Sequence, residues 1–230
     1  MKNRLSVGKT KPLFLLCLFL FPLLLRGQLY VVELAIRKNL PAPVVTDTTV
    51  LNRLQSDPLW KTLSLPEQEL VYWTNYSRVN PARFWDSVVV PHLKVYPSLA
   101  GPESASLETD LKASRPLPIF SLNSRLLQTA RLHALDIARS ESYPSHNSTN
   151  GTDFNTRMNE AGIRKCAYQN MAVGAHSILL SIVLLYLDIR LPEQGHRKAL
   201  LNPSLIEMGV GYAPYGKDRF FLVQDMACKQ

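Results

Sequence analysis

Strand-like patterns appear only in the last third of this 230-residue chain, and their late position limits the folds that it can adopt. Two of these runs, 206–213 and 219–227, are joined by the turn residues Pro214-Tyr215-Gly216-Lys217-Asp218, which predicts a β-hairpin. A third run, 166–173, also has a strand pattern. Since helical periodicity fills the chain before them, we expect an α+β domain in which helices cover a small antiparallel sheet.

The helical patterns have clear starts and stops. Ser64 and Glu67 stand at capping-box spacing around Pro66, and Asn80-Pro81 ends the helix that they open. Residues 96–118 hold four prolines and several serines, so we expect a connecting excursion there. The predicted helical stretches are 67–79, 82–93, 123–138, 154–162 and the apolar run 176–187.

The first 27 residues have the pattern of a secretory signal peptide. Five basic residues and no acid flank an apolar run, Leu13–Leu25, that is too short to span about 30 Å of hydrocarbon. An uncleaved membrane anchor is the alternative. We expect cleavage after Gly27, then a linker or loosely packed N-terminal arm over 28–62, and one folded domain over 63–230.

The net charge of +8 comes mostly from this leader. Without residues 1–27 the chain has 21 basic and 18 acidic residues, a balance that does not favour nucleic-acid binding. It also lacks the glycine-rich patterns that bind phosphates. The sequence therefore predicts no nucleic-acid partner and, once the leader is removed, no membrane span.

Two cysteines remain after the leader, Cys166 and Cys228. Exported proteins fold in an oxidising compartment, where an even number of cysteines is most simply explained by a disulfide. Two unpaired buried thiols are the alternative that the sequence leaves open.

The five histidines differ in their surroundings. His146 lies in a polar loop, Ser145–Gly151, and His196 precedes a short helix, so both stand where loops meet helix ends. For His133 and His176 we expect hydrogen-bonded or partly buried positions, and His92 has no functional pattern. His146 and His196 are therefore the candidates for a functional site.

From Leu65 onward the sequence resembles the bacterial type of the CAP superfamily, which contains cysteine-rich secretory, antigen 5 and pathogenesis-related proteins and whose domain is also called SCP. The matching motifs stand in order along the chain: Asn75-Tyr76-Ser77-Arg78-Val79-Asn80-Pro81, Ala130–Asp136, the His146 loop with Gly151 and Arg157, Gln169–Gly174, Pro192–Lys198 and Met208–Tyr212. The resemblance implies an α-β-α sandwich around a small three-stranded antiparallel sheet.

The resemblance also implies a cleft lined by two histidines and, in many members, two acids. His146 and His196 match the histidines, while Gln169 replaces the acid that usually precedes Asn170. Asp188 and Glu193 are the two candidates for the second acid. Two imidazoles could hold a divalent cation, Zn²⁺ or Ca²⁺, but an amide oxygen is a poorer ligand than a carboxylate. Gln169 can still orient an imidazole by a hydrogen bond.

Two function classes follow. We expect a secreted, periplasmic or cell-surface binding module, not an enzyme, whose His-lined cleft takes a lipid, a peptide or a cell-surface protein. The alternative is a divalent-metal-dependent hydrolase that uses His146 and His196. Hydrolysis needs a nucleophile bonded to a base or a metal-activated water, and the adjacency of Ser145 to His146 is no evidence for such a pair. Cys166 could act as a nucleophile only if it is not in a disulfide.

Overall fold

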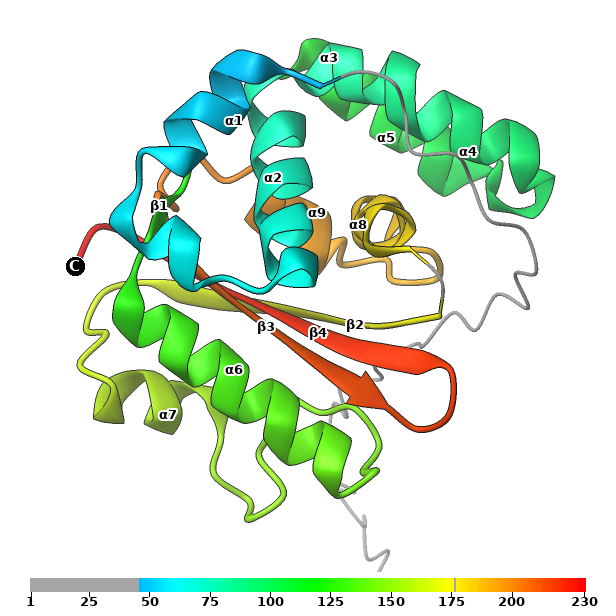
Figure 1. The fold of residues 1–230 in the computed structure, drawn as a ribbon. Helices are drawn as coiled ribbons and strands as arrows, with labels where there is room; N and C mark the ends of the chain where they lie inside the picture. Colours follow the sequence, from blue (N-terminus) through cyan, green and yellow to red (C-terminus); the bar gives the residue numbers. More distant parts are fainter. Residues whose placement is uncertain (1–45, 176) are drawn as a thin grey trace, which may run out of the picture.

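The computed structural model describes residues 46–175 and 177–230. The predicted signal peptide, its cleavage site after Gly27, the first part of the predicted arm and His176 lie outside the described residues. The described chain forms a sheet between two groups of helices (Figure 1).

The sheet has four strands in the order β1-β3-β4-β2. Three of them, β2 (Ala167–Gly174), β3 (Glu207–Tyr215) and β4 (Arg219–Ala227), pair antiparallel, as the sequence predicts. The expected count of three is a correction, because β1 (Ser121–Leu122) adds a short fourth strand parallel to β3. Two paired residues are too few to leave a periodic pattern in the sequence.

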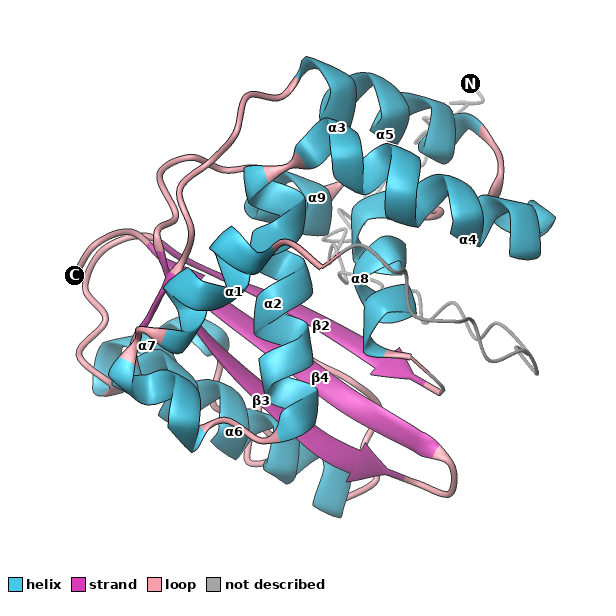
Figure 2. Cartoon of the chain, turned by 45° about the horizontal axis from the view of Figure 1, so that its top comes forward, coloured by secondary structure: helices cyan, strands magenta, loops and turns pink. Residues whose placement is uncertain are grey.

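Helices cover both faces of this sheet (Figures 1 and 2). On one face lie α6 and α7, and on the other lie α2, α8 and α9, with α3, α4 and α5 farther from the strands. The helices are α1 (Thr48–Gln55), α2 (Leu65–Val79), α3 (Pro81–Phe84), α4 (Val90–Val95), α5 (Pro102–Ala113), α6 (Ser124–Arg139), α7 (Phe154–Glu160), α8 (Ile178–Leu187) and α9 (Gly195–Leu200). A π-helical turn, Trp85–Val89, joins α3 to α4.

Two glycines of β3 allow α6 to approach the sheet closely. A Cβ at Gly209 would overlap the backbone of Leu126 and Leu127, and a Cβ at Gly211 would overlap the backbone of Ala130. The helix and the strand therefore touch backbone to backbone. This packing explains the Met208–Tyr212 motif physically and holds α6 against the face of the sheet on which Gln169 and Asp225 lie.

The opposite face packs against the main apolar core. The apolar helix α8 is buried on most sides, as its composition predicts, and contributes to this core together with α2. The Glu67 carboxylate accepts hydrogen bonds from the Ser64 amide and hydroxyl, which confirms the predicted helix start. On this face Gln224 of β4 donates to the Thr74 hydroxyl over 2.7 Å.

Two segments are more ordered than the sequence indicates. Within the predicted loose arm, residues 48–55 form α1 and residues 58–62 a 3₁₀ helix, capped by Asp47 and Asp57. Trp60 is buried in the core, so this part of the chain belongs to the domain. Within the predicted excursion, residues 102–113 form α5, whose Leu107 side chain is fully buried. These three helices are short or weakly patterned, and tertiary packing stabilises them.

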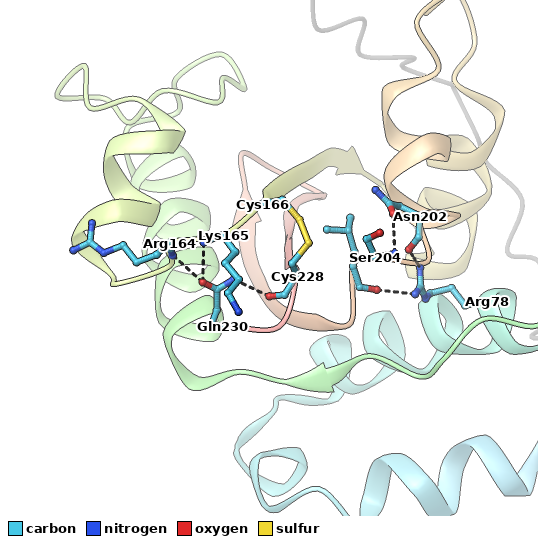
Figure 3. Close-up of a disulfide and its surroundings, with 9 residues drawn as sticks. Arg78, Arg164, Lys165, Cys166, Asn202, Ser204, Cys228 and Gln230 are labelled. Carbon is cyan, nitrogen blue, oxygen red and sulfur yellow. Dashed lines mark hydrogen bonds between the residues drawn. A yellow bond between two sulfur atoms is a disulfide. The ribbon is translucent and has the colours of Figure 1, made fainter.

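A disulfide joins Cys166, just before β2, to Cys228, just after β4 (Figure 3). The Cys228 amide also donates to the Cys166 carbonyl over 3.0 Å. Next to this bond, the side-chain oxygen of Gln230 accepts from the amides of Arg164 and Lys165, at 2.8 and 3.1 Å. These bonds hold Gln230 next to the segment that leads into β2.

Candidate functional site

His146 lies in the loop between α6 and α7, and polar contacts hold that loop to both helices. Asp136 of α6 accepts from the Thr149 amide at 2.8 Å. Arg157 of α7 donates to the His146 carbonyl at 2.9 Å and to the Thr152 carbonyl at 3.1 Å. These contacts explain why the loop motif includes Arg157.

His146 as a whole residue is exposed, its ring contact is partly buried, and its Nδ1 lies 3.0 Å from Oε1 of Gln169 on β2. Loss of water around the ring, with smaller effects from His196 and Arg157, holds the pKa of His146 below its ordinary value, although the bond to Gln169 acts the other way. The expected role of Gln169, orienting an imidazole by a hydrogen bond, is the geometry found here.

Gln169 also bonds the carboxyl group of Asp225, which the sequence patterns did not lead us to expect at the site. The Gln169 amide nitrogen donates to Oδ1 of Asp225 over 2.8 Å, and Thr129 of α6 lies 2.8 Å from Oδ2. Asp225 is completely buried, and burial raises its pKa to about 6, against hydrogen bonds from Gln169 and Thr129 that lower it. The signal was present in β4, where Gln224-Asp225 interrupts an apolar strand, because a buried carboxyl group requires partners.

His196 opens the first turn of α9, and its Nδ1 lies 2.5 Å from Oδ1 of Asp188. Asp188 is buried at the end of α8, and its Oδ2 accepts from the Arg197 amide at 2.9 Å. Glu193, the other acid considered beside His196, is exposed at the turn that precedes α9. The carboxylate in contact with the imidazole is therefore that of Asp188.

The two histidines come from opposite sides of the sheet and meet near β2. Asn170, next to Gln169 on this strand, donates to the His196 carbonyl at 3.5 Å. The charge of His196 is also one of the smaller causes that lower the pKa of His146. The structure thus gathers His146, Gln169 and His196 around β2 and leaves Glu193 at the surface.

The other described histidines have structural positions. Nε2 of His133 lies 2.9 Å from the Ser145 carbonyl, and burial, followed by the charge of Arg157, lowers the pKa of His133 to about 4. His92 is buried and bonds the Val88 carbonyl at 2.7 Å. Both therefore stabilise the fold, His133 by holding the start of the His146 loop.

The side chains bonded to the two rings by described residues are the Gln169 amide and the Asp188 carboxylate. Residues 46–175 and 177–230 contain no group of three or more His, Cys, Asp or Glu side chains arranged to hold a metal ion. The Ser145 hydroxyl accepts from the Asn147 amide, and Cys166 is in the disulfide. A surface hollow lies on the outer side of α6, lined by Leu132, Leu135, Asp136, Arg139 and Ser140. The cleft expected between His146 and His196 remains a prediction.

The order of elements and the motifs around His146 and His196 agree with a match to a protein family. The model of the CAP family, described as the cysteine-rich secretory protein family, matches residues 76–226. The chain belongs to this family. Within the CAP domain, both site histidines, Gln169 and Asp225 fall inside the matched region.

Solved structures add more distant similarities. They include an extracellular SCP-domain protein of Bacillus anthracis, with 24% identity over 56% of this chain and 44% of that one, at a TM-score of 0.38. An outer surface protein of Borrelia burgdorferi matches with 15% identity over 60% of this chain and 92% of that one, at a TM-score of 0.42. Venom allergen-like protein 4 of Schistosoma mansoni matches with 15% identity over 73% of this chain and 91% of that one, at a TM-score of 0.46. This CAP chain thus spans less than half of the Bacillus protein.

No curated protein sequence matches the chain at a significant level. Among the helices formed by the described residues, none combines the length and the apolar character that a membrane crossing requires.

Proposed function

We propose that this CAP protein is an exported, non-enzymatic binding protein that contacts its partner through His146 and His196. One observation carries the proposal: each ring uses Nδ1 to bond a side chain of its own domain, Gln169 or Asp188, and no bond from a described residue occupies Nε2. Both rings are therefore held in place with one nitrogen left for a ligand.

A binding role fits this arrangement better than hydrolysis. A Ser, Thr or Cys nucleophile must lie within hydrogen-bond reach of its base, and the described partners of the two rings are instead an amide and a carboxylate. Replacement of an acid by Gln169 also removes a carboxylate that would bind a divalent cation. Both features favour a binding role over a metal-dependent hydrolase.

Three features support export and an extracellular partner. The first 27 residues have a basic region followed by an apolar run, which is the pattern of a secretory signal. The Cys166–Cys228 disulfide suits an oxidising compartment. The family to which the chain belongs is described as secretory. The partner classes are a lipid, a peptide or a cell-surface protein.

Native mass spectrometry of the protein purified after secretion tests the proposal. We expect an additional mass that is retained by the wild type and lost from a His146→Ala/His196→Ala double variant. Glu193→Ala is the matched control, because Glu193 is exposed close to His196 in sequence and bonds neither ring. A retained divalent ion lost from both single histidine variants, or a peptidase or esterase activity lost from the double variant, would contradict the proposal.

A further inference from the structure

We propose that Asp225, acting through Gln169, holds His146 in the neutral tautomer that carries its proton on Nδ1. His146 then presents a nitrogen lone pair at Nε2, so a group that forms a hydrogen bond there must be the donor, such as an ammonium, amide or hydroxyl group. This inference deepens the proposed function, because it names the chemical class that the same site accepts.

The first step is the orientation of the Gln169 amide. Its nitrogen lies 2.8 Å from Oδ1 of Asp225, and a carboxylate oxygen can only accept. If the amide turned over, two oxygens would face each other at this distance. The amide nitrogen must therefore point to Asp225, and Oε1 must point to His146.

This orientation is compatible both with an ionised Asp225 and with an Asp225 that carries its proton on Oδ2. Thr129 has one hydroxyl proton, yet its oxygen lies 3.0 Å from the Leu126 carbonyl and 2.8 Å from Oδ2 of Asp225. When Asp225 carries a proton on Oδ2, it donates to Thr129, and Thr129 donates to Leu126. When Asp225 is ionised, Thr129 donates to it instead. In both states Oδ1 remains free to accept from Gln169.

The second step is the proton on the ring. Oε1 of Gln169 has only lone pairs and lies 3.0 Å from Nδ1 of His146, so Nδ1 must donate. A neutral imidazole has one proton, which leaves Nε2 as an acceptor. His133 has the opposite tautomer by the same reasoning, since its Nε2 faces the Ser145 carbonyl at 2.9 Å.

Burial makes the constraint strong. Gln169 is 8% exposed and Asp225 is fully buried. Water therefore cannot readily replace the bond from Gln169 to Asp225 if that bond is lost. His196 also has Nδ1 directed at a buried carboxylate, that of Asp188. In their neutral forms the two rings therefore both present Nε2 lone pairs, which a carboxylate or a phosphodiester cannot satisfy because neither brings a proton at neutral pH.

Long-range ¹H–¹⁵N NMR of the imidazole rings at about pH 8, above the ordinary histidine pKa, reads the tautomer directly. We expect His146, assigned from the signals missing in His146→Ala, to be the Nδ1–H form in the wild type. Gln169→Met and Asp225→Leu should shift it toward Nε2–H. Asp225→Asn should keep Nδ1–H, because the asparagine oxygen can accept from Gln169 while its nitrogen donates to Thr129. His133 should stay Nε2–H in every variant.

A wild-type His146 in the Nε2–H form overturns the inference, and so does a folded Asp225→Leu variant that keeps Nδ1–H. If that variant does not fold, hydrogen exchange of the Gln169 side-chain amide in the wild type decides: slow exchange supports the bond to Asp225, and exchange at the rate of exposed glutamines overturns it. None of these readouts needs a natural ligand, so they are independent of the mass spectrometry that tests the proposed function.

A matched pair of probes tests the ligand class. Butylammonium and butyrate have the same alkyl length, but the first has a donor head group and the second has only acceptors at this pH. We expect butylammonium to shift the Nε2 resonance of His146 more than butyrate does at equal concentration. An equal or larger shift with butyrate would overturn the ligand assignment.

Discussion

Oδ2 of Asp188 accepts the backbone amide of Arg197 at 2.9 Å, so the buried carboxylate at the end of α8 also fastens the first turn of α9. Its other oxygen contacts Nδ1 of His196. One side chain thus connects the helix that fills the core to the helix that carries a site histidine. The position of His196 depends on this contact.

Asp188→Asn should destabilise the fold by about 2 kcal/mol, because an amide has one acceptor oxygen where Asp188 serves two donors. Asparagine suits the left-handed backbone at this position, where φ is 48°, so backbone strain does not confuse the result. Urea denaturation measures the change. Glu193→Gln, the same chemical change on an exposed side chain, should alter stability by less than about 0.5 kcal/mol.

Arg78→Met should cost about 3 kcal/mol or more. The Arg78 guanidinium is completely buried and donates to the Leu200, Asn202 and Leu205 carbonyls at 2.6, 3.2 and 2.8 Å. Methionine keeps part of the apolar stem but leaves three buried acceptors without these donors. Thermal and urea unfolding measure the loss, with Arg115→Met on an exposed side chain as the control. A loss no larger than that of the control would contradict the role assigned to Arg78, which fastens the 200–205 segment (Figure 3).

Gly211→Ala should destabilise the domain by about 3 kcal/mol, since its Cβ would overlap the backbone of Ala130 and force α6 away from β3. Gly195→Ala is the matched control. A Cβ there meets open space, and alanine in a helix should be neutral or stabilising by up to about 1 kcal/mol. Equal stabilities of the two variants in urea would show that α6 can move at little cost.

The pKa of Asp225 predicts a pH dependence that Asp225→Asn should remove. Because burial raises this pKa to about 6, the folded protein holds the proton more tightly than the unfolded chain does. Stability from this group is therefore present at low pH and is lost as pH rises from about 4 to 6, by about 2–3 kcal/mol in total. His133, whose pKa is lowered to about 4, has the opposite effect over about pH 4 to 6.5.

In the wild type, Asp225 and His133 change the free energy of unfolding in opposite directions as pH rises. The quantity to measure is therefore the difference in stability between Asp225→Asn and the wild type at each pH. Urea denaturation at about pH 4 and about pH 7.5 should show Asp225→Asn gaining about 2 kcal/mol relative to wild type at the higher pH. A difference that does not change with pH would mean that Asp225 does not titrate in this range.

Loss of the disulfide should cost about 4 kcal/mol in the chain-entropy account, because Cys166 and Cys228 are 62 residues apart in sequence. The Cys166→Ala/Cys228→Ala variant, compared with the wild type in urea, measures this contribution. Intact mass before and after reduction under denaturing conditions reports whether the bond forms in the secreted protein. A wild type that gains no mass on reduction has no bridge.

Strong local patterns made much of the fold predictable. The hairpin of β3 and β4 follows from two apolar runs around a turn, and α2 follows from a capping box and an Asn-Pro stop. In contrast, β1 is two residues long and α1 only eight, so neither segment is long enough for its pattern to be a reliable signal. The family motifs indicated His146, Gln169 and His196 as the candidate site, and the structure gathers these residues around β2.

The sequence by itself determined the chemistry available at the site: two histidines, a glutamine at the position where the family resemblance implies an acid, and a composition that does not favour nucleic acid. Only the tertiary structure decided how that chemistry is arranged. Gln169 contacts Asp225, 56 residues farther along the chain, because β2 and β4 pair side by side and place both side chains on the face toward α6. Such a contact depends on strand register and burial, which act between segments far apart in sequence, and no local pattern encodes it.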